Sequence, residues 1–234
     1  MRRVSIGFVC AAAALALAAC DAPPPEAQPA DTADAAYAEA PLPVSGPERD
    51  ILAFGNSLFA GYNVAPEEAY PARLQAALRA RGVNADVTNA GVSGDTTAAG
   101  LQRLAFTLDA QDEAPDLVIL ELGGNDLLRG IPVEETRANL AEMLQILRDR
   151  EIPTLLMGMR APPNLGADYV TRFDALYGEL AEEYGAELVP FWLESIYQRP
   201  DLFQSDRIHP TAEGIEELVG DTADEVAAAL GEGE

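Results

Sequence analysis

The chain has 234 residues and carries 15 basic residues against 39 Asp and Glu residues, which gives a formal net charge of −24. So acidic a surface repels a phosphate backbone and gains nothing from counterion release, and this argues against nucleic-acid binding. Every basic residue is Arg, which excludes a P-loop lysine and a Schiff-base lysine, and the single histidine, His209, excludes a metal site built from several imidazoles.

The N-terminus has the pattern of a bacterial export signal. Two arginines precede an apolar stretch at residues 4–19, which is too short and too rich in Ala to predict a membrane-spanning helix. The stretch ends in Leu17-Ala18-Ala19-Cys20, which resembles the lipobox of bacterial lipoproteins. That resemblance implies a signal peptide over residues 1–19, cleavage before Cys20 and lipidation of Cys20. The alternative is a plain secretory signal that is cut nearby.

Residues 20–49 are rich in Pro, Ala and acidic residues and contain one aromatic residue, Tyr37. Such a composition cannot fill a core, so it predicts a disordered tether between a lipid anchor and a folded body. The folded domain is predicted over residues 50–234, a length that buries one sizeable core. Both cysteines of the chain precede this domain, so its stability is expected to come from an ordinary core without disulfides.

Apolar, β-rich runs alternate with helical patterns along the predicted domain. Short apolar runs predict buried parallel strands at residues 51–54, 117–120, 154–157 and 187–190, with a weaker candidate at 83–88. Apolar residues at helical spacing predict helices at residues 66–81, 96–108, 133–150, 168–184 and 211–230. The alternation predicts an α/β fold, a three-layer α/β/α sandwich around a parallel sheet of about five strands.

Ligands of such sheets bind beyond the carboxyl ends of the strands, so the residues just after each strand are candidates for chemistry. Three segments follow predicted strands and a fourth precedes the last predicted helix: Gly55-Asn56-Ser57-Leu58, residues 89–96, Gly123-Gly124-Asn125-Asp126 and Asp206-Arg207-Ile208-His209-Pro210. If they meet at one rim, they bring together a serine, glycine amides, an asparagine and an Asp/His pair. This set contains the groups needed for serine acyl transfer.

Each of these groups also has a purely structural interpretation. Ser57 could cap a helix, the glycines could serve turns with positive φ, the polar residues after the third strand could be turn residues, and His209 could be an exposed loop residue. The scarcity of serine favours the chemical interpretation, because only Ser57 and Ser93 of the six serines follow a predicted strand. The α/β-hydrolase elbow G-x-S-x-G is excluded, since Phe59 occupies its last glycine position.

The four segments resemble the blocks of the SGNH branch of the GDSL hydrolases, which contribute Ser, Gly, Asn and His in that chain order. The matching segments are Ser57-Leu58-Phe59-Ala60-Gly61-Tyr62, Ser93-Gly94-Asp95-Thr96, Glu121-Leu122-Gly123-Gly124-Asn125-Asp126 and Ile208-His209-Pro210. The similarity to bacterial periplasmic enzymes with combined arylesterase, acyl-CoA thioesterase and lysophospholipase activity extends over most of residues 51–212. It implies the flavodoxin-like fold of the SGNH hydrolases.

The resemblance also implies a role for each candidate residue. Ser57 is the expected nucleophile, His209 the general base and then acid, and Asp206 the carboxylate that orients the imidazole. The backbone amides of Ser57 and Gly94 and the side-chain amide of Asn125 are the expected oxyanion hole. No metal ion and no cofactor are expected.

One position departs from the family pattern, because the usual Asp before the nucleophile is Asn56 here. An Asn keeps a carbonyl acceptor, loses the charge and gains two donors, so a hydrogen-bonding role can survive while a charge-dependent role cannot. Asp95 and Asp126 are the candidates for a negative charge nearby.

Together with the resemblance, the sequence predicts a serine esterase or thioesterase that hydrolyses small to medium acyl esters through an acyl-serine intermediate. Its expected partners are this substrate and a membrane, to which the lipid anchor would hold it on the periplasmic side of a bacterial cell envelope. Two alternatives stay open: a carbohydrate deacetylase of the same fold, and a non-catalytic lipoprotein that binds an acyl chain or a glycan. Acyl-length preference is expected to depend on the rim loops at residues 127–132 and 160–169.

Overall fold

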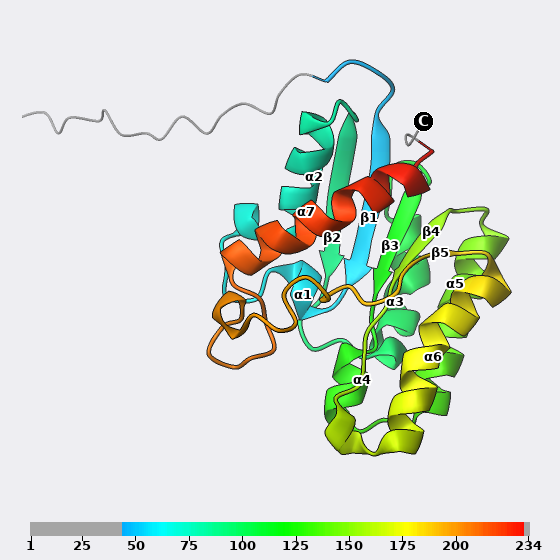
Figure 1. Ribbon diagram of the computed structural model, residues 1–234. Helices are drawn as coiled ribbons and strands as arrows, with labels where there is room; N and C mark the ends of the chain where they lie inside the picture. The colour runs from blue at the N-terminus through cyan, green and yellow to red at the C-terminus, as the bar shows by residue number, and fades with distance from the viewer. Residues whose placement is uncertain (1–43, 232–234) are drawn as a thin grey trace, which may run out of the picture. The chain divides into compact units, whose positions relative to one another are not determined.

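The computed structural model describes residues 44–231 (Figure 1). The predicted signal peptide at residues 1–19, the lipidation residue Cys20 and residues 20–43 of the predicted tether lie outside the described residues and stay predictions. The first strand begins at Arg49, next to the predicted start of the folded domain. Within residues 44–231, no helix combines the length and the apolar character that crossing a membrane requires.

A parallel sheet lies between two layers of helices, and within residues 44–231 its five strands follow the order β2-β1-β3-β4-β5 (Figure 1). The strands are β1 (Arg49–Gly55), β2 (Ala85–Gly91), β3 (Leu117–Glu121), β4 (Thr154–Met157) and β5 (Glu187–Val189). All residues of β3 and β4 are buried, because helices cover both faces of the sheet, and this explains their continuous apolar runs. The predicted α/β fold with a parallel sheet of about five strands is confirmed.

The helices form one layer on each face of the sheet. One layer pairs α2 (Tyr70–Ala80) with α7 (Ala212–Ala229), and the other contains α3 (Thr97–Asp109), α5 (Val133–Asp149) and α6 (Ala167–Tyr184) (Figure 1). Leu74 and Leu78 of α2 and Leu140 and Leu144 of α5 are buried. Residues four positions apart lie on one side of a helix, so each of these pairs covers the sheet with a single apolar stripe.

The observed elements differ from the predicted ones by more than two residues at two places. The predicted helix at 66–81 is divided into the 3₁₀ turn η1 (Pro66–Glu68) and α2, since Pro71 favours a new helix start at this point. The prediction that the second strand ends at residue 88 is wrong, because β2 continues to Gly91 in register with β1. Pairing with β1 overrides the turn preference of Asn89.

Two glycines allow close packing where β1 ends. Gly55 of β1 lies opposite Gly91 of β2 on one side and Glu121 of β3 on the other. A Cβ atom on Gly91 would lie 2.4 Å from the backbone nitrogen of Ala60 in the short helix α1 (Ser57–Ala60), and a Cβ on Gly55 would lie 2.9 Å from the Glu121 carboxylate. Only a residue without a side chain admits these contacts. Helix α1 therefore lies directly on the rim where the first three strands end.

Candidate active site

Ser57 occupies the first position of α1, directly beyond β1. The N-cap is Asn56, whose Oδ1 accepts a hydrogen bond from the Leu58 N–H at 3.0 Å. The alternative interpretation of Ser57 as a helix cap is therefore wrong, and its hydroxyl is not used to satisfy the helix terminus. Ser57 is buried and lines a pocket at this rim.

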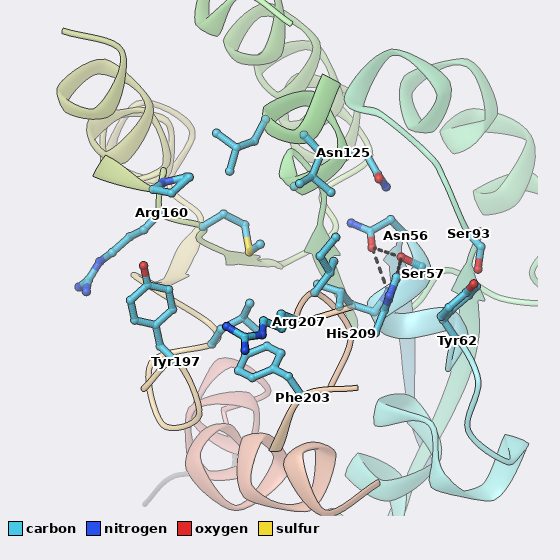
Figure 2. Close-up of a pocket in the computed structure, with 18 of the residues that line it drawn as sticks. Asn56, Ser57, Tyr62, Ser93, Asn125, Arg160, Tyr197, Phe203, Arg207 and His209 are labelled. Atoms are coloured by element: carbon cyan, nitrogen blue, oxygen red, sulfur yellow. Dashed lines mark hydrogen bonds between the residues drawn. The ribbon is translucent and has the colours of Figure 1, made fainter. Parts of the chain in front are cut away.

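The Ser57 hydroxyl is one end of a hydrogen-bonded series of three side chains. His209 Nε2 lies 2.8 Å from Ser57 Oγ (Figure 2), and His209 Nδ1 lies 2.7 Å from Asp206 Oδ2. Asp206 is held in place by its Oδ1, which accepts from the backbone N–H groups of Ile208 at 2.9 Å and His209 at 3.1 Å. The structure thus brings together the three residues to which the sequence assigns a triad.

The charge of Asp206 determines which ring nitrogen of His209 carries the proton. Partial burial raises the pKa of Asp206, but hydrogen bonds from the His209 ring and from the backbone N–H groups of Ile208 and His209 lower it, so that the pKa is about 2. An ionised carboxylate only accepts hydrogen bonds, so Nδ1 of the neutral imidazole is the donor. Nε2 is then an acceptor and can take the proton of Ser57.

Hydrogen bonds between its two ends close the loop that carries His209. Phe203 and Pro210 form an antiparallel bridge, and the Gln204 N–H donates to the His209 carbonyl at 2.8 Å. The side-chain amide of Gln204 donates to the carbonyls of Tyr62 at 2.8 Å and Pro210 at 2.9 Å. The Tyr62 ring also stacks on the imidazole, with 4.3 Å between the ring centroids. These contacts fix the loop against the segment that follows α1.

Three N–H donors lie around the pocket beside Ser57. Asn125, in α4 (Gly124–Arg129), donates one Nδ2 hydrogen to the Asp95 carbonyl at 2.9 Å, which fixes the amide and leaves its second hydrogen for another acceptor. In the part of the chain that the structure describes, the backbone N–H groups of Ser57 and Gly94 have no protein acceptor. The three residues assigned to an oxyanion hole therefore line one pocket with donor hydrogens available.

Arg103 of α3 joins the segments that form the rim. Its Nε donates to Asp95 Oδ2 at 2.7 Å, its Nη2 donates to the Gly55 carbonyl at 2.9 Å, and its guanidinium lies 3.8 Å from the centroid of the Phe54 ring. Because Asp95 also accepts from Asn125, the ends of β1 and β2 and helix α4 form one network. Sequence reasoning missed Arg103, since an Arg within an amphipathic helix is typical of a solvent-exposed side chain.

Residues 53–216 match the family described as the GDSL-like Lipase/Acylhydrolase family. The chain belongs to this family. Two curated relatives of this GDSL hydrolase have assigned activities. An arylesterase of Vibrio mimicus is 40% identical over 163 residues, which cover 70% of this chain and 80% of the relative. The thioesterase 1/protease 1/lysophospholipase L1 of Escherichia coli (strain K12) is 39% identical over 160 residues, which cover 68% and 74% respectively.

Solved structures of the family agree with the fold of this GDSL hydrolase. AlinE4, a SGNH-hydrolase family esterase, is 61% identical, with a TM-score of 0.68 over 80% of this chain and 98% of AlinE4. The structure of TesA is 35% identical, with a TM-score of 0.73 over 77% of this chain and 99% of TesA. The resemblance to the SGNH branch and the fold that it implies are confirmed.

Asn56 of this GDSL hydrolase contacts a buried carboxylate that sequence reasoning did not single out. Glu121 has no solvent exposure, and its Oε1 accepts from Asn56 Nδ2 at 2.9 Å while its Oε2 accepts from the Asn56 backbone N–H at 3.2 Å. Asp95 and Asp126, which the sequence suggested as sources of charge beside Asn56, are engaged elsewhere: Asp95 pairs with an arginine of α3, and Asp126 accepts from threonine hydroxyls. The carboxylate at Asn56 is therefore that of Glu121.

The pocket has a volume of about 560 Å³; polar side chains lie around Ser57, Asn125 and His209, and two arginines, Arg160 and Arg207, lie in other parts of its wall (Figure 2). Most of the remaining wall is apolar. Both predicted rim loops contribute to it, and so does the segment from residue 193 to 203, which the sequence did not indicate because it has no regular periodicity. The apolar wall consists of Leu58, Leu127, Leu128, Met159, Pro162, Leu193, Tyr197, Pro200, Phe203 and Ile208. Within residues 44–231, no three His, Cys, Asp or Glu side chains are grouped so that they could hold a metal ion.

We predict that Glu121 makes the folded state less stable as the pH rises. Burial raises the pKa of Glu121 and the two N–H groups of Asn56 lower it, so that its value is about 8, against 4.5 for an exposed Glu. Between these values the folded state keeps a proton that the unfolded chain has released, so a higher pH favours unfolding by up to about 1.4 kcal/mol per pH unit.

Chemical unfolding between about pH 5 and pH 9 measures this effect, with Glu121→Gln as the variant that lacks the titrating group. The free energy of unfolding of the wild type is expected to fall more steeply with pH than that of the variant. Parallel curves for the two proteins would contradict the prediction.

Proposed function

We propose that this GDSL hydrolase cleaves carboxylic esters and thioesters of small to medium acyl groups, with Ser57 as its nucleophile. The observation that carries the proposal is the hydrogen-bonded series of Ser57, His209 and Asp206 at the polar end of an apolar pocket. The names of the relatives, arylesterase and thioesterase 1/protease 1/lysophospholipase L1, support the same reaction class.

The geometry supports a two-step acyl transfer. As Ser57 Oγ forms a bond to the acyl carbon, its proton moves to His209 Nε2, and Asp206 stabilises the resulting imidazolium. Collapse of the tetrahedral intermediate breaks the bond to the leaving oxygen or sulfur, which receives the proton from Nε2. Water then attacks the acyl-serine with the same base, and the step releases the carboxylic acid and restores the Ser57 hydroxyl.

The negative charge of the tetrahedral intermediate would be stabilised by the N–H groups of Ser57, Gly94 and Asn125. These donors are fixed before the reaction, because Asn125 is bonded to the Asp95 carbonyl and the other two are backbone groups. Donors that need no reorganisation are the most effective way to stabilise a developing charge.

The wall of the pocket favours an acyl chain over a sugar. A carbohydrate deacetylase needs polar side chains for sugar hydroxyls, whereas most residues of this wall are aliphatic or aromatic. A non-catalytic binding protein has no use for an imidazole aligned between a serine and a carboxylate. A panel of p-nitrophenyl esters and acyl-CoA thioesters of increasing length measures the preference within the proposed class.

Ser57→Ala is expected to abolish both ester hydrolysis and covalent labelling by a fluorophosphonate probe, since no other serine has the imidazole as a hydrogen-bond partner in the described residues. The fold should persist, because the loss of one hydrogen bond costs about 1 kcal/mol. Mass mapping of the labelled wild type is expected to find the label on Ser57, and Ser93→Ala is expected to keep it. Retained turnover in Ser57→Ala would contradict the assignment.

Asn125→Ala is expected to lower kcat by about 10²- to 10³-fold with little change in KM, because the amide serves a charge that appears mainly in the transition state. Steady-state kinetics on one p-nitrophenyl ester measure both constants. The control is Asn139→Ala in α5, whose side chain contacts Thr97 and does not line the pocket. An effect of Asn125→Ala on KM alone would make it a substrate-binding residue.

We further propose that the chain is a lipoprotein of the bacterial envelope, held on the periplasmic side by a lipid on Cys20. Support comes from the sequence alone, in the apolar stretch at residues 4–19 and the lipobox-like Leu17-Ala18-Ala19-Cys20. The proline-rich residues 20–49 would give the hydrolase reach from the membrane surface.

Cys20→Ala is expected to abolish incorporation of radiolabelled palmitate and to shift the protein from the membrane fraction to the soluble fraction. Cys10→Ala is the matched control, because Cys10 would leave with the signal peptide, so both properties should be retained. Palmitate incorporation that persists in Cys20→Ala would exclude Cys20 as the lipidated residue.

A further inference from the structure

We propose that Glu121 is a positioning residue that holds the nucleophile in place through Asn56. The inference rests on the proposed function of Ser57 as the nucleophile. The strand register places Glu121, the last residue of β3, opposite Gly55, so its carboxylate reaches the residue that precedes Ser57. Gly55 leaves the space for this approach, since a Cβ atom there would lie 2.9 Å from Glu121 Oε2.

The hydrogen bonds of Asn56 permit only one orientation of its amide. Oδ1 accepts from the Leu58 N–H at 3.0 Å and lies 3.3 Å from the Ser57 hydroxyl, so the atom that faces Glu121 is the donor Nδ2. The backbone N–H of Asn56 is a second donor to the same carboxyl group. Two donors directed at two oxygens need an acceptor at both, and the carboxyl group of Glu121 has an oxygen at both positions, whereas a carboxamide has only one.

Glu121 lies beside no cation in the described part of the chain. Its polar partners among the described residues are the two N–H groups of Asn56, and no arginine in residues 44–231 forms an ion pair with it. Burial of a carboxyl group with so few partners is unfavourable for folding, whereas an apolar residue of similar size would fill the same space without this penalty. A role at the neighbouring nucleophile accounts for a side chain that packing alone does not require.

The Asn56 amide, which Glu121 holds in one orientation, positions Ser57 in two ways. It caps α1 at Leu58, so it sets the position of the first residue of that helix, which is Ser57. It also lies beside Ser57 Oγ, which stands 3.3 Å from Asn56 Oδ1 and 2.8 Å from His209 Nε2. Without Glu121 the amide could rotate and present Nδ2 to the Leu58 N–H, and both contacts would be lost.

Exchanging the carboxyl group of Glu121 with the carboxamide of Asn56 tests the proposal. The side chain introduced by Glu121→Gln offers one acceptor and one donor, so one N–H of Asn56 then faces an N–H of the introduced carboxamide. We expect kcat on a p-nitrophenyl ester to fall about 10- to 100-fold while KM stays within about twofold, because the nucleophile shifts and the pocket wall does not. Adding Asn56→Asp restores complementarity, because the introduced amide then donates to the introduced carboxylate, which still accepts from Leu58. The kcat of this double variant is expected to return to within about threefold of the wild type.

Thr222→Val is the control for the loss of a buried polar group. Thr222 is 1% exposed and lies 2.7 Å from the Tyr70 hydroxyl, between α7 and α2 and away from the pocket. This variant is expected to be less stable to heat and to keep its kcat within about twofold, whereas Glu121→Gln should lose kcat even where it melts at the wild-type temperature.

Two results would overturn the proposal: a folded Glu121→Gln with the kcat of the wild type, or a folded double variant whose kcat stays about tenfold or more below it. The double variant keeps the test decisive even where the single variant does not fold. Fluorophosphonate labelling of the wild type separates this test from that of the proposed function. A wild type without label at Ser57 rejects the nucleophile itself, while a labelled wild type with an unaffected Glu121→Gln rejects only the positioning role.

Discussion

The alignment of β1 with its two parallel neighbours is the constraint on which the site depends. Gly55 ends β1 opposite Gly91 and Glu121, so β1, β2 and β3 stop at one level and deliver the residues that follow them to one rim. A shift of β3 by one residue would turn Glu121 to the opposite face of the sheet. The contact with Asn56 would then be lost, and Asn125, which follows β3, would leave the Asp95 carbonyl.

The sequence predicts the parts of this arrangement that have a local signal. The buried run at residues 117–120 and the segments around Ser57 and Asn125 could be found because apolar strands end in glycine and polar residues. The edge strand β2 gave a weaker signal, since most of its side chains are exposed or half-buried and its end, Asn89 to Gly91, is typical of a turn. Its last residues are held by β1, a partner distant in the chain, which no local pattern shows.

Glu121 and Arg103 were not predicted because their roles follow from pairing and burial. A Glu at the end of a strand and an Arg on an amphipathic helix are both typical of solvent-exposed positions. The other charged pairs of the described surface illustrate that ordinary case: Arg81 with Asp224 is well exposed, and pairs of this kind contribute at most about 1 kcal/mol. Glu121 is the opposite case, a buried carboxyl group that is unfavourable for folding and that lies beside the candidate nucleophile, where proteins commonly accept such a loss of stability.

The site is built from two parts that the fold supplies independently. The nucleophile and the N–H donors stand on the rim, fixed by strand register, whereas His209 and Asp206 lie on a loop beyond β5. Gln204 and Tyr62 connect the two parts, through a hydrogen bond of 2.8 Å between them and the stacking of Tyr62 on the imidazole. The same stretch of chain that carries the base also supplies the apolar wall from residue 193 to 203. A change in that wall can therefore move the imidazole as well as reshape the pocket, so acyl preference and turnover are physically coupled in this hydrolase.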